Sequence, residues 1–147
     1  MKICVQRIKC GKVTLVKTGE ITGQIGPGLL IFLGVKTGDT SKEAAFLAAK
    51  AANLRIFEDS DGKMNKSLLD IGGEALVVSQ FTLYGDAQKG RRPSFTEAAR
   101  PDIAEKLYRE FLRLLKNEGV PVQTGAFQQE MDVETVNTGP VTILIES

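Results

Sequence analysis

Two uninterrupted apolar runs set the strongest limit on how this chain can fold. Residues 29–35 (Leu-Leu-Ile-Phe-Leu-Gly-Val) and 76–78 (Leu-Val-Val) contain no polar side chain, which is typical of strands that are covered on both faces of a sheet. We therefore expect residues 29–35 near the centre of the sheet. No segment reaches the roughly 18 consecutive apolar residues of a membrane span, so no membrane partner is predicted.

Helix signals separate the predicted strands. Thr40 and Glu43 have the spacing of a capping box and predict a helix over about residues 41–54. Pro101 suits the first turn of a helix and predicts the longest helix, which runs to about Glu118. On the inward face of this helix we expect Ile103, Leu107, Phe111 and Leu114.

A second Ser-x-x-Glu pattern, formed by Ser94 and Glu97, predicts a short helix that Pro101 ends. Further strands are expected at residues 13–17, 20–25, 55–58, 120–124, 130–136 and 141–145. Strands at both ends with two main helices between them predict a mixed α/β fold, with a largely antiparallel or mixed β-sheet or barrel. The simplest organisation of 147 residues is one domain over residues 1–147.

The chain contains no histidine, which excludes Ser-His-Asp and Cys-His catalysis and every metal site that requires a histidine. Cys4 and Cys10 have neither the spacing of a metal site nor that of a disulfide framework, so reduced thiols in a cytoplasmic protein are expected. We expect no metal and no cofactor. The net charge is +1, but the last 31 residues carry −5 and the first 116 carry +6, which permits an anionic partner on one side.

Polar residues follow the second apolar run without a turn residue between them. The pattern extends this strand to Tyr84, and strand alternation places Gln80 and Thr82 on one face and Ser79 and Phe81 on the other. Buried hydroxyl and amide groups need hydrogen-bond partners in the protein or in a ligand. Two interpretations remain open: the segment closes a sheet edge by local hydrogen bonds, or it forms a ligand site.

Asn137-Thr138-Gly139-Pro140 separates the last two predicted strands. Gly139 allows an unusual backbone conformation, and Pro140 removes a hydrogen-bond donor at the start of a strand. A cis bond before Pro140 or a tight turn would account for this pattern, and a plain edge turn remains the alternative.

A basic cluster, Lys89, Arg91 and Arg92, follows seven residues beyond Thr82. A solvated loop is the ordinary interpretation of such a cluster. The alternative is a contact with the phosphate groups of a substrate that also reaches Thr82.

These segments closely resemble a known family. Ser79-Gln80-Phe81-Thr82-Leu83 and Asn137-Thr138-Gly139-Pro140-Val141-Thr142 are similar to the two signatures of the D-aminoacyl-tRNA deacylases (D-Tyr-tRNA deacylase family). Further similar segments occur in matching order along essentially the whole chain: Val5-Gln6-Arg7, Gly26-Pro27-Gly28-Leu29-Leu30, Arg55-Ile56-Phe57, Gly62-Lys63-Met64-Asn65, Arg91-Arg92-Pro93-Ser94-Phe95 and Gln123-Thr124-Gly125. The sequence departs mildly from the family pattern at Lys9-Cys10-Gly11-Lys12, a segment that we expect in the first hairpin.

The resemblance implies a D-Tyr-tRNA deacylase-like fold and an enzyme that hydrolyses the ester between a D-amino acid and the 3′ end of tRNA, releasing both. It implies that residues 79–82 lie at the terminal adenosine and the scissile carbonyl. The catalytic residues implied in this way are Ser79, Gln80, Phe81 and Thr82.

The resemblance also implies a homodimer with a cross-subunit active site. A cis Gly139-Pro140 pair of one subunit would reach the pocket of the other, where its carbonyl groups hold the substrate amino group and an L side chain would clash. The residues that enforce this chirality would be Asn137, Gly139 and Pro140. Glycine has no side chain and should pass the same filter.

Without histidine, catalysis would depend on the backbone and on the substrate itself. Main-chain N–H groups near Phe81 and Thr82 are expected to stabilise the developing oxyanion. Either the 2′-hydroxyl of the terminal adenosine helps to activate water, or Thr82 acts as a nucleophile. No base adjoins Thr82 in the sequence, which favours the substrate-assisted version. Lys89, Arg91 and Arg92 are the candidates for phosphate contacts with the tRNA acceptor end.

Two rival hypotheses remain at this stage. A nucleic-acid-binding module on the same fold would bind without hydrolysis, and changes of Thr82 or Pro140 would leave its function intact. A structural dimer would use residues 79–82 only to close a sheet edge and would bind no ligand.

Overall fold

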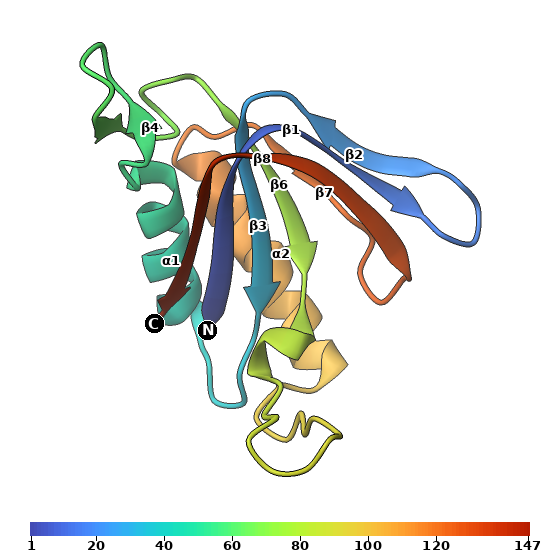
Figure 1. Cartoon of the computed structure of the whole chain (residues 1–147). Coiled ribbons are helices and arrows are strands. Elements are labelled where there is room, and N and C mark those ends of the chain that lie inside the picture. Colours follow the sequence, from blue (N-terminus) through green and yellow to red (C-terminus); the bar gives the residue numbers. More distant parts are fainter.

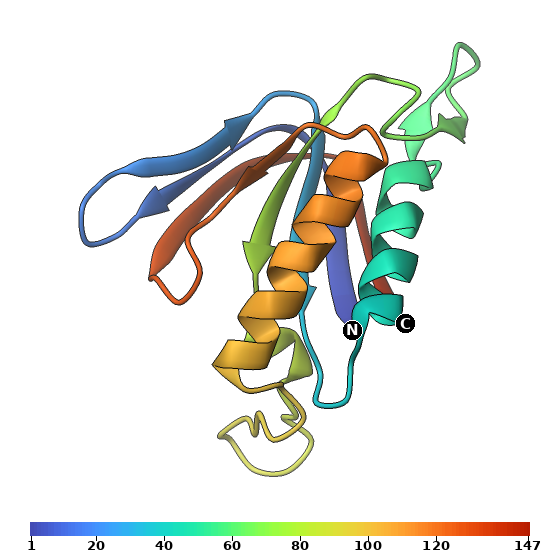
Figure 2. The ribbon, with the colours of Figure 1, turned by 180° about the vertical axis from the view of Figure 1, so that it is seen from behind.

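The fold is organised around one long strand, β1 (Lys2–Leu15). The computed structural model describes residues 1–147 and shows a curled, mixed sheet with two helices on one face (Figures 1 and 2). Along one edge β1 pairs first with β3 (Gly28–Gly34) and then with β2 (Ile21–Ile25). Along its other edge β1 pairs with β8 (Met131–Glu146), and all three pairings are antiparallel.

The sheet continues from β3 through two parallel neighbours. β6 (Glu74–Ser79) pairs with β3, and β7 (Val122–Thr124) pairs with β6, so β3 is central as its apolar sequence predicts. The two far edges approach each other, because a Cβ atom at Gly23 of β2 would lie 2.8 Å from the carbonyl oxygen of Thr124 in β7. The sheet is therefore nearly closed into a barrel, and the predicted mixed α/β fold is confirmed.

Both predicted main helices are present, as α1 (Ser41–Asn53) and α2 (Pro101–Asn117). The predicted capping box of α1 is formed: the Thr40 N–H donates to the Glu43 carboxylate at 2.7 Å, and the Thr40 hydroxyl accepts from the first turn. Pro101 occupies the first helical position of α2, where its missing N–H has no cost.

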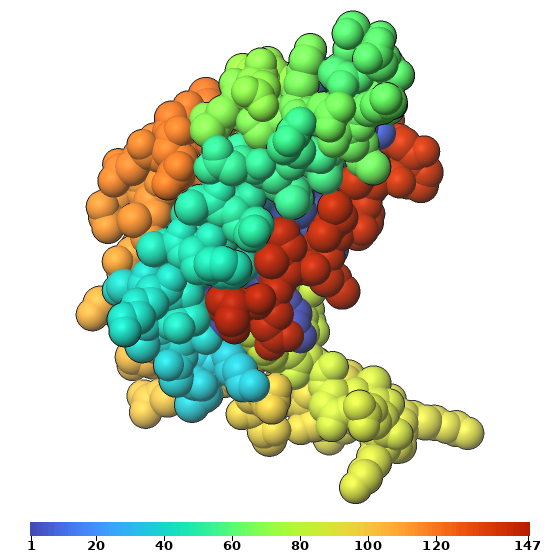
Figure 3. All heavy atoms as spheres, turned by 90° about the vertical axis from the view of Figure 1, so that its left-hand side faces the viewer, coloured from blue at the N-terminus to red at the C-terminus, as the bar shows by residue number.

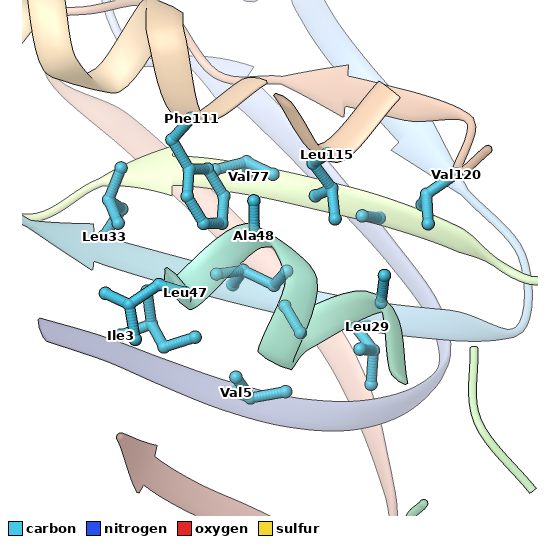
Figure 4. Packing of buried hydrophobic residues seen from close by; sticks show 14 of the residues in the cluster. Ile3, Val5, Leu29, Leu33, Leu47, Ala48, Val77, Phe111, Leu115 and Val120 are labelled. Atoms are coloured by element: carbon cyan, nitrogen blue, oxygen red, sulfur yellow. The ribbon is translucent and has the colours of Figure 1, made fainter. Parts of the chain in front are cut away.

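Buried side chains fill both faces of the sheet. Figure 4 shows the larger cluster, in which residues of α1 and α2 meet the helix-facing residues of the strands. Its members include Ile3, Val5, Leu29, Leu33, Leu47, Ala48, Val77, Phe111, Leu115 and Val120. Inside the curl of the sheet lies a smaller cluster, Ile8, Val13, Ile25, Leu30, Leu76 and Val78. Burial on both faces explains why the two apolar runs lack alternation.

The inward face of α2 differs from the prediction. Ile103 is 46% exposed and Leu114 is only half-buried, whereas Tyr108 and Leu115 are buried. The Tyr108 hydroxyl donates to the carbonyl oxygen of Val77 at 2.9 Å, so the helix turns this side chain toward β6. The buried face of α2 therefore consists of Leu107, Tyr108, Phe111 and Leu115 and excludes Ile103.

Two local predictions are wrong. The strand expected to continue to Tyr84 ends at Ser79, and η1, a 3-10 helix, covers Phe81–Tyr84. The short helix expected from Ser94 does not form. Its backbone N–H and C=O instead exchange hydrogen bonds of 2.8 Å with Asp86, which closes a loop over residues 86–94.

The strand boundaries near both ends also differ from the prediction. Residues 137–140 do not separate two strands, because β8 is continuous and pairs with β1 on both sides of them, with irregular register opposite. Residues 9–12 lie in β1, and Gly11 and Lys12 pair with Ile25 and Gln24 of β2, so this segment reaches into the first hairpin as expected; the turn follows Leu15. The strand predicted at residues 55–58 is shorter, as β4 (Phe57–Glu58), and pairs with β5 (Met64–Lys66). Neither helix is long and apolar enough to cross a membrane.

Candidate active site

Residues 79–82 lie where β6 leaves the sheet and η1 begins. The Gln80 N–H donates to the carbonyl oxygen of Leu33 at 2.7 Å, which is the last backbone hydrogen bond from this segment to β3. η1 is closed by bonds from the Leu83 N–H to Gln80 and from the Gly85 N–H to Thr82, at 3.2 and 2.9 Å. The first N–H groups of such a turn have no partner inside it, so those of Phe81 and Thr82 are free for a ligand.

The side chains of this segment are partly or fully exposed. The Gln80 amide donates to the Thr82 hydroxyl, so the two side chains are held together. Phe81 is 56% exposed and packs edge-on against Phe95, with ring centroids 5.1 Å apart. The alternation predicted for Gln80 and Thr82 does not apply, because the strand has already ended before either residue.

A cavity of about 750 Å³ opens beside this segment. Three of the predicted residues line it, Ser79, Gln80 and Phe81, whereas Thr82 does not. The remaining walls come from the ends of β3 and β6, Phe95, residues 98–100, the first turns of α2 and residues between 127 and 133, with mainly apolar side chains. Binding sites for small groups of a substrate are commonly apolar hollows with a few polar groups at one end, as in this cavity.

The cavity contains no evident catalytic base. Its ionisable lining residues are Arg100, Tyr108 and Glu130. Burial raises the pKa of the Tyr108 hydroxyl above its ordinary value, so this group stays neutral. Its hydrogen bond to a backbone carbonyl gives it a structural role. Chemistry here would depend on backbone N–H groups, neutral side chains and the substrate.

The second predicted segment, residues 137–140, is held from behind by a buried arginine. Arg7 is 7% exposed; its Nε donates to the Thr138 carbonyl oxygen at 3.0 Å, and its Nη1 donates to that of Ile56 at 2.8 Å. The Asn137 side chain accepts from the Val141 N–H at 3.0 Å. These bonds fix the backbone on both sides of Gly139.

Only glycine fits at position 139. Its φ is +124°, which side chains rarely permit, and a Cβ atom would lie 2.6 Å from Nη2 of Arg7. The peptide bond between Gly139 and Pro140 is cis. Both residues are exposed, so the segment presents its backbone to solvent or to a partner.

One chain does not bring the two segments together. The register places Ser79 level with Leu33, Ile3 and Ile145, whereas residues 137–142 lie level with Arg7. Four residues along a strand and three strand spacings therefore separate them, which corresponds to roughly 20 Å along the sheet. Figure 1 shows η1 at one end of the sheet and the bend of β8 at the other.

The basic loop lies at the same end of the molecule as η1. Lys89, Arg91 and Arg92 are exposed and form no ion pair. Side chains of this loop project well clear of the surface (Figure 3). The loop is therefore placed to contact a long ligand that enters the cavity.

Sequence reasoning missed most of the cavity lining and the role of Arg7. The cavity walls at Phe95, Tyr108 and residues 127–131 come from distant parts of the chain and share no spacing. Arg7 did carry a signal, because it follows Ile3 and Val5 on the inward face of β1, where a charged residue needs specific partners. No group of three or more potential acidic or thiol ligands is arranged to hold a metal ion.

Known proteins match this chain over essentially its whole length. The sequence model of the family described as D-Tyr-tRNA(Tyr) deacylase matches residues 4–146. A protein of Carboxydothermus hydrogenoformans named D-aminoacyl-tRNA deacylase is 53% identical over 146 residues, 99% of each chain. A protein of the same name from Alkaliphilus metalliredigens is 56% identical over 147 residues, 100% of this chain and 97% of the relative.

Two solved structures have the same fold. One is described as a c-Myc DNA Unwinding Element Binding Protein; it is 40% identical, with a TM-score of 0.92, and covers 100% of this chain and 99% of its own. The other, a probable eukaryotic D-amino acid tRNA deacylase, has a TM-score of 0.85 over 99% of this chain and 98% of its own at 17% identity, which shows the fold alone. Fold and sequence together define a member of a hydrolase family. The chain belongs to the D-Tyr-tRNA(Tyr) deacylase family.

Proposed function

We propose that this protein hydrolyses the ester bond of D-aminoacyl-tRNA and releases the free D-amino acid and tRNA. The observation that carries this proposal is identity of 53% to 56% with D-aminoacyl-tRNA deacylases over essentially the whole chain. The cavity beside residues 79–81 supports it by offering a space for the aminoacyl-adenosine end. Such an enzyme would act in the cytoplasm as a proofreading step of translation.

The reaction requires attack of water on the ester carbonyl. The water oxygen bonds to the carbonyl carbon, the negative charge collects on the carbonyl oxygen, and the 3′ oxygen of the tRNA leaves with a proton. The free N–H groups of Phe81 and Thr82 suit stabilisation of that charge. Ser79 and Gln80 would orient the substrate.

We infer that the 2′-hydroxyl of the terminal adenosine assists the attacking water. Thr82 has no base beside it: its hydroxyl contacts the neutral Gln80 amide, and the residue is absent from the cavity wall. Thr82→Val separates the two mechanisms. Substrate assistance predicts a loss of about tenfold or less, whereas loss of a nucleophile would abolish turnover by several orders of magnitude.

The 137–140 segment would complete the site from a second subunit. A separation of roughly 20 Å within one chain leaves it too far away to contact a substrate at residues 79–82. A homodimer in which each copy inserts Gly139 and Pro140 beside the cavity of the other removes this difficulty. Backbone carbonyls fixed by Arg7 and Asn137 would then bind the substrate amino group and clash with an L side chain. Glycyl-tRNA would pass the same filter.

Contacts with tRNA would begin at the basic loop. Lys89, Arg91 and Arg92 are exposed and form no ion pair, and their loop lies at the end of the molecule that carries η1 (Figure 1), so they can neutralise phosphates without reading sequence. Exposed cations of this kind contribute to affinity and to the association rate.

The proposal is tested by incubating the purified protein with matched D- and L-tyrosyl-tRNA and measuring amino acid release. We expect rapid release of D-tyrosine and retention of the L-ester. Release at equal rates would refute the chirality filter, and no release by folded protein would refute the hydrolase.

A second candidate is a nucleic-acid-binding module on the same fold without hydrolysis. The observation in its favour is the similarity to a structure described as a DNA Unwinding Element Binding Protein. Retained binding of tRNA with no ester cleavage in the same experiment would support it.

A further inference from the structure

The outer face of α2 carries a row of cations that the proposed site does not use. Lys106, Arg109, Arg113 and Lys116 are all exposed and recur at intervals of three and four residues. This spacing places them on one side of the helix, over a length of about 15 Å. We call this row the α2 stripe.

The opposite side of the same helix faces the cavity. Arg100, Pro101, Ala104 and Tyr108 line it, so α2 begins at the cavity and carries the stripe away from it. The basic 86–93 loop leads through residues 94–100 into this end of α2 (Figures 1 and 2). Cavity and loop therefore both lie at the end of α2 from which the stripe runs.

The acidic residues near the α2 stripe do not prevent it from binding phosphate groups. Glu105 pairs with Arg109 at 2.6 Å and Glu110 pairs with Arg113 at 3.7 Å, but the two arginine side chains remain 72% and 60% exposed. Exposed ion pairs of this type contribute little, so a phosphate group can replace the carboxylate. Lys106 and Lys116 form no ion pair at all.

The outer faces of α1 and β8 lack this pattern. The exposed face of α1 has only Lys42 and Lys50, eight residues apart, with the exposed Phe46 between them. The outer face of β8 carries the acids Asp132 and Glu134. A row of phosphates would therefore meet a favourable field along α2 and an unfavourable one along β8.

We propose that the α2 stripe binds the phosphate backbone of the tRNA acceptor arm. This inference rests on the proposed function and adds the direction in which the RNA leaves the cavity. The contacts are made to phosphates, so they give affinity that depends on salt and not on the acceptor sequence.

The test compares two variants with the same charge change. Lys106→Ala with Lys116→Ala removes the two unpaired cations of the stripe, and Lys42→Ala with Lys50→Ala removes two lysines from α1. Three quantities are measured for each: affinity for uncharged tRNA from 50 to 300 mM salt, turnover of D-tyrosyl-tRNA, and turnover of D-tyrosyl-adenosine, which has no acceptor arm.

We expect the stripe variant to weaken tRNA binding about tenfold and to reduce the slope of log affinity against log salt by about 1 to 2, while the α1 variant changes little. Turnover of D-tyrosyl-adenosine should be unchanged in both. Equal effects of the two variants, or no effect, would overturn the proposal. If the wild type cleaves neither ester but the stripe variant still loses tRNA affinity, the deacylase assignment fails and the stripe stands.

Discussion

The two signature segments of this protein are held in opposite ways. Residues 79–82 lie at the end of β6 and in the turn after it, beside a large cavity, and their side chains contact one another and Phe95. Residues 137–140 are fixed by the buried Arg7, yet they are absent from the lining of that cavity. One segment has space for a substrate and the other has a rigid backbone, so we infer that two copies of the chain are needed to combine them.

The largest effect is expected from removing a backbone donor at the first segment. Phe81→Pro deletes one N–H, and the backbone of Gln80, with φ −145° and ψ 82°, lies outside the helical region that a following proline disfavours. Loss of one oxyanion donor should reduce kcat on D-tyrosyl-tRNA by about 10²- to 10³-fold. Phe81→Ala keeps the N–H and serves as the control; an equal loss in both variants would show that the ring matters and the donor does not.

The second segment should be sensitive to added volume. Gly139→Ala places a Cβ atom against Arg7 and strains a backbone at φ +124°. Displacement of this backbone by about 1 Å should reduce turnover of the D-ester by up to 10²-fold and weaken discrimination against the L-ester. Gly19→Ala is the control, because Gly19 has φ +71° but no neighbour within 4 Å. Full activity and selectivity in Gly139→Ala would separate this segment from catalysis.

The hydrogen bonds of Arg7 to the second segment should contribute to the stability of the fold. Arg7→Met leaves the buried carbonyl group of Ile56 and the partly buried one of Thr138 without the donors of Arg7, which should lower the free energy of unfolding by about 2–4 kcal/mol. Lys12→Met removes a partly exposed ion pair with Glu134 and should cost under about 1 kcal/mol. Urea unfolding measures both. Similar losses of unfolding free energy in the two variants would mean that the hydrogen bonds of Arg7 do not specifically stabilise the second segment.

The smallest effects concern two buried tyrosines near the first segment. The Tyr84 hydroxyl is buried without a partner, so Tyr84→Phe should leave stability unchanged or raise it slightly, by under about 1 kcal/mol. Tyr108→Phe removes a bond to Val77 and should cost about 1 kcal/mol. Thermal unfolding compares the two variants. A larger loss of stability in Tyr84→Phe than in Tyr108→Phe would show that the Tyr84 hydroxyl does have a partner.

Burial raises the pKa of both hydroxyls, so the folded state retains these protons longer than the unfolded state. The wild type should therefore lose stability as the pH rises above about 10, the ordinary pKa of tyrosine.

Much of the fold was predictable because its signals are local. The capping box at Thr40 and the proline at position 101 define the helix starts, and the apolar run at residues 29–35 defines the central strand. The errors arose where tertiary contacts overrule local preference. Ser94 has the pattern of a helix cap, but its backbone is already engaged by Asp86.

The candidate site was predictable only as two separate segments. Residues 79–82 and 137–140 stood out because polar groups and a proline interrupt strand patterns. Neither segment reveals the cavity, whose walls at Phe95 and Tyr108 become neighbours only in the folded chain. The bond from Arg7 to Thr138 joins residues 131 positions apart, which no spacing rule anticipates.

The most direct test of the cross-subunit claim is the activity of a purified heterodimer. One subunit would carry Phe81→Pro and the other Gly139→Ala, with different affinity tags, and turnover of D-tyrosyl-tRNA would be compared with each parent. If segments 79–82 and 137–140 meet across the dimer, one of the two sites is intact and about half of the wild-type activity returns. A heterodimer no more active than its parents, or a fully active monomer, would contradict the account.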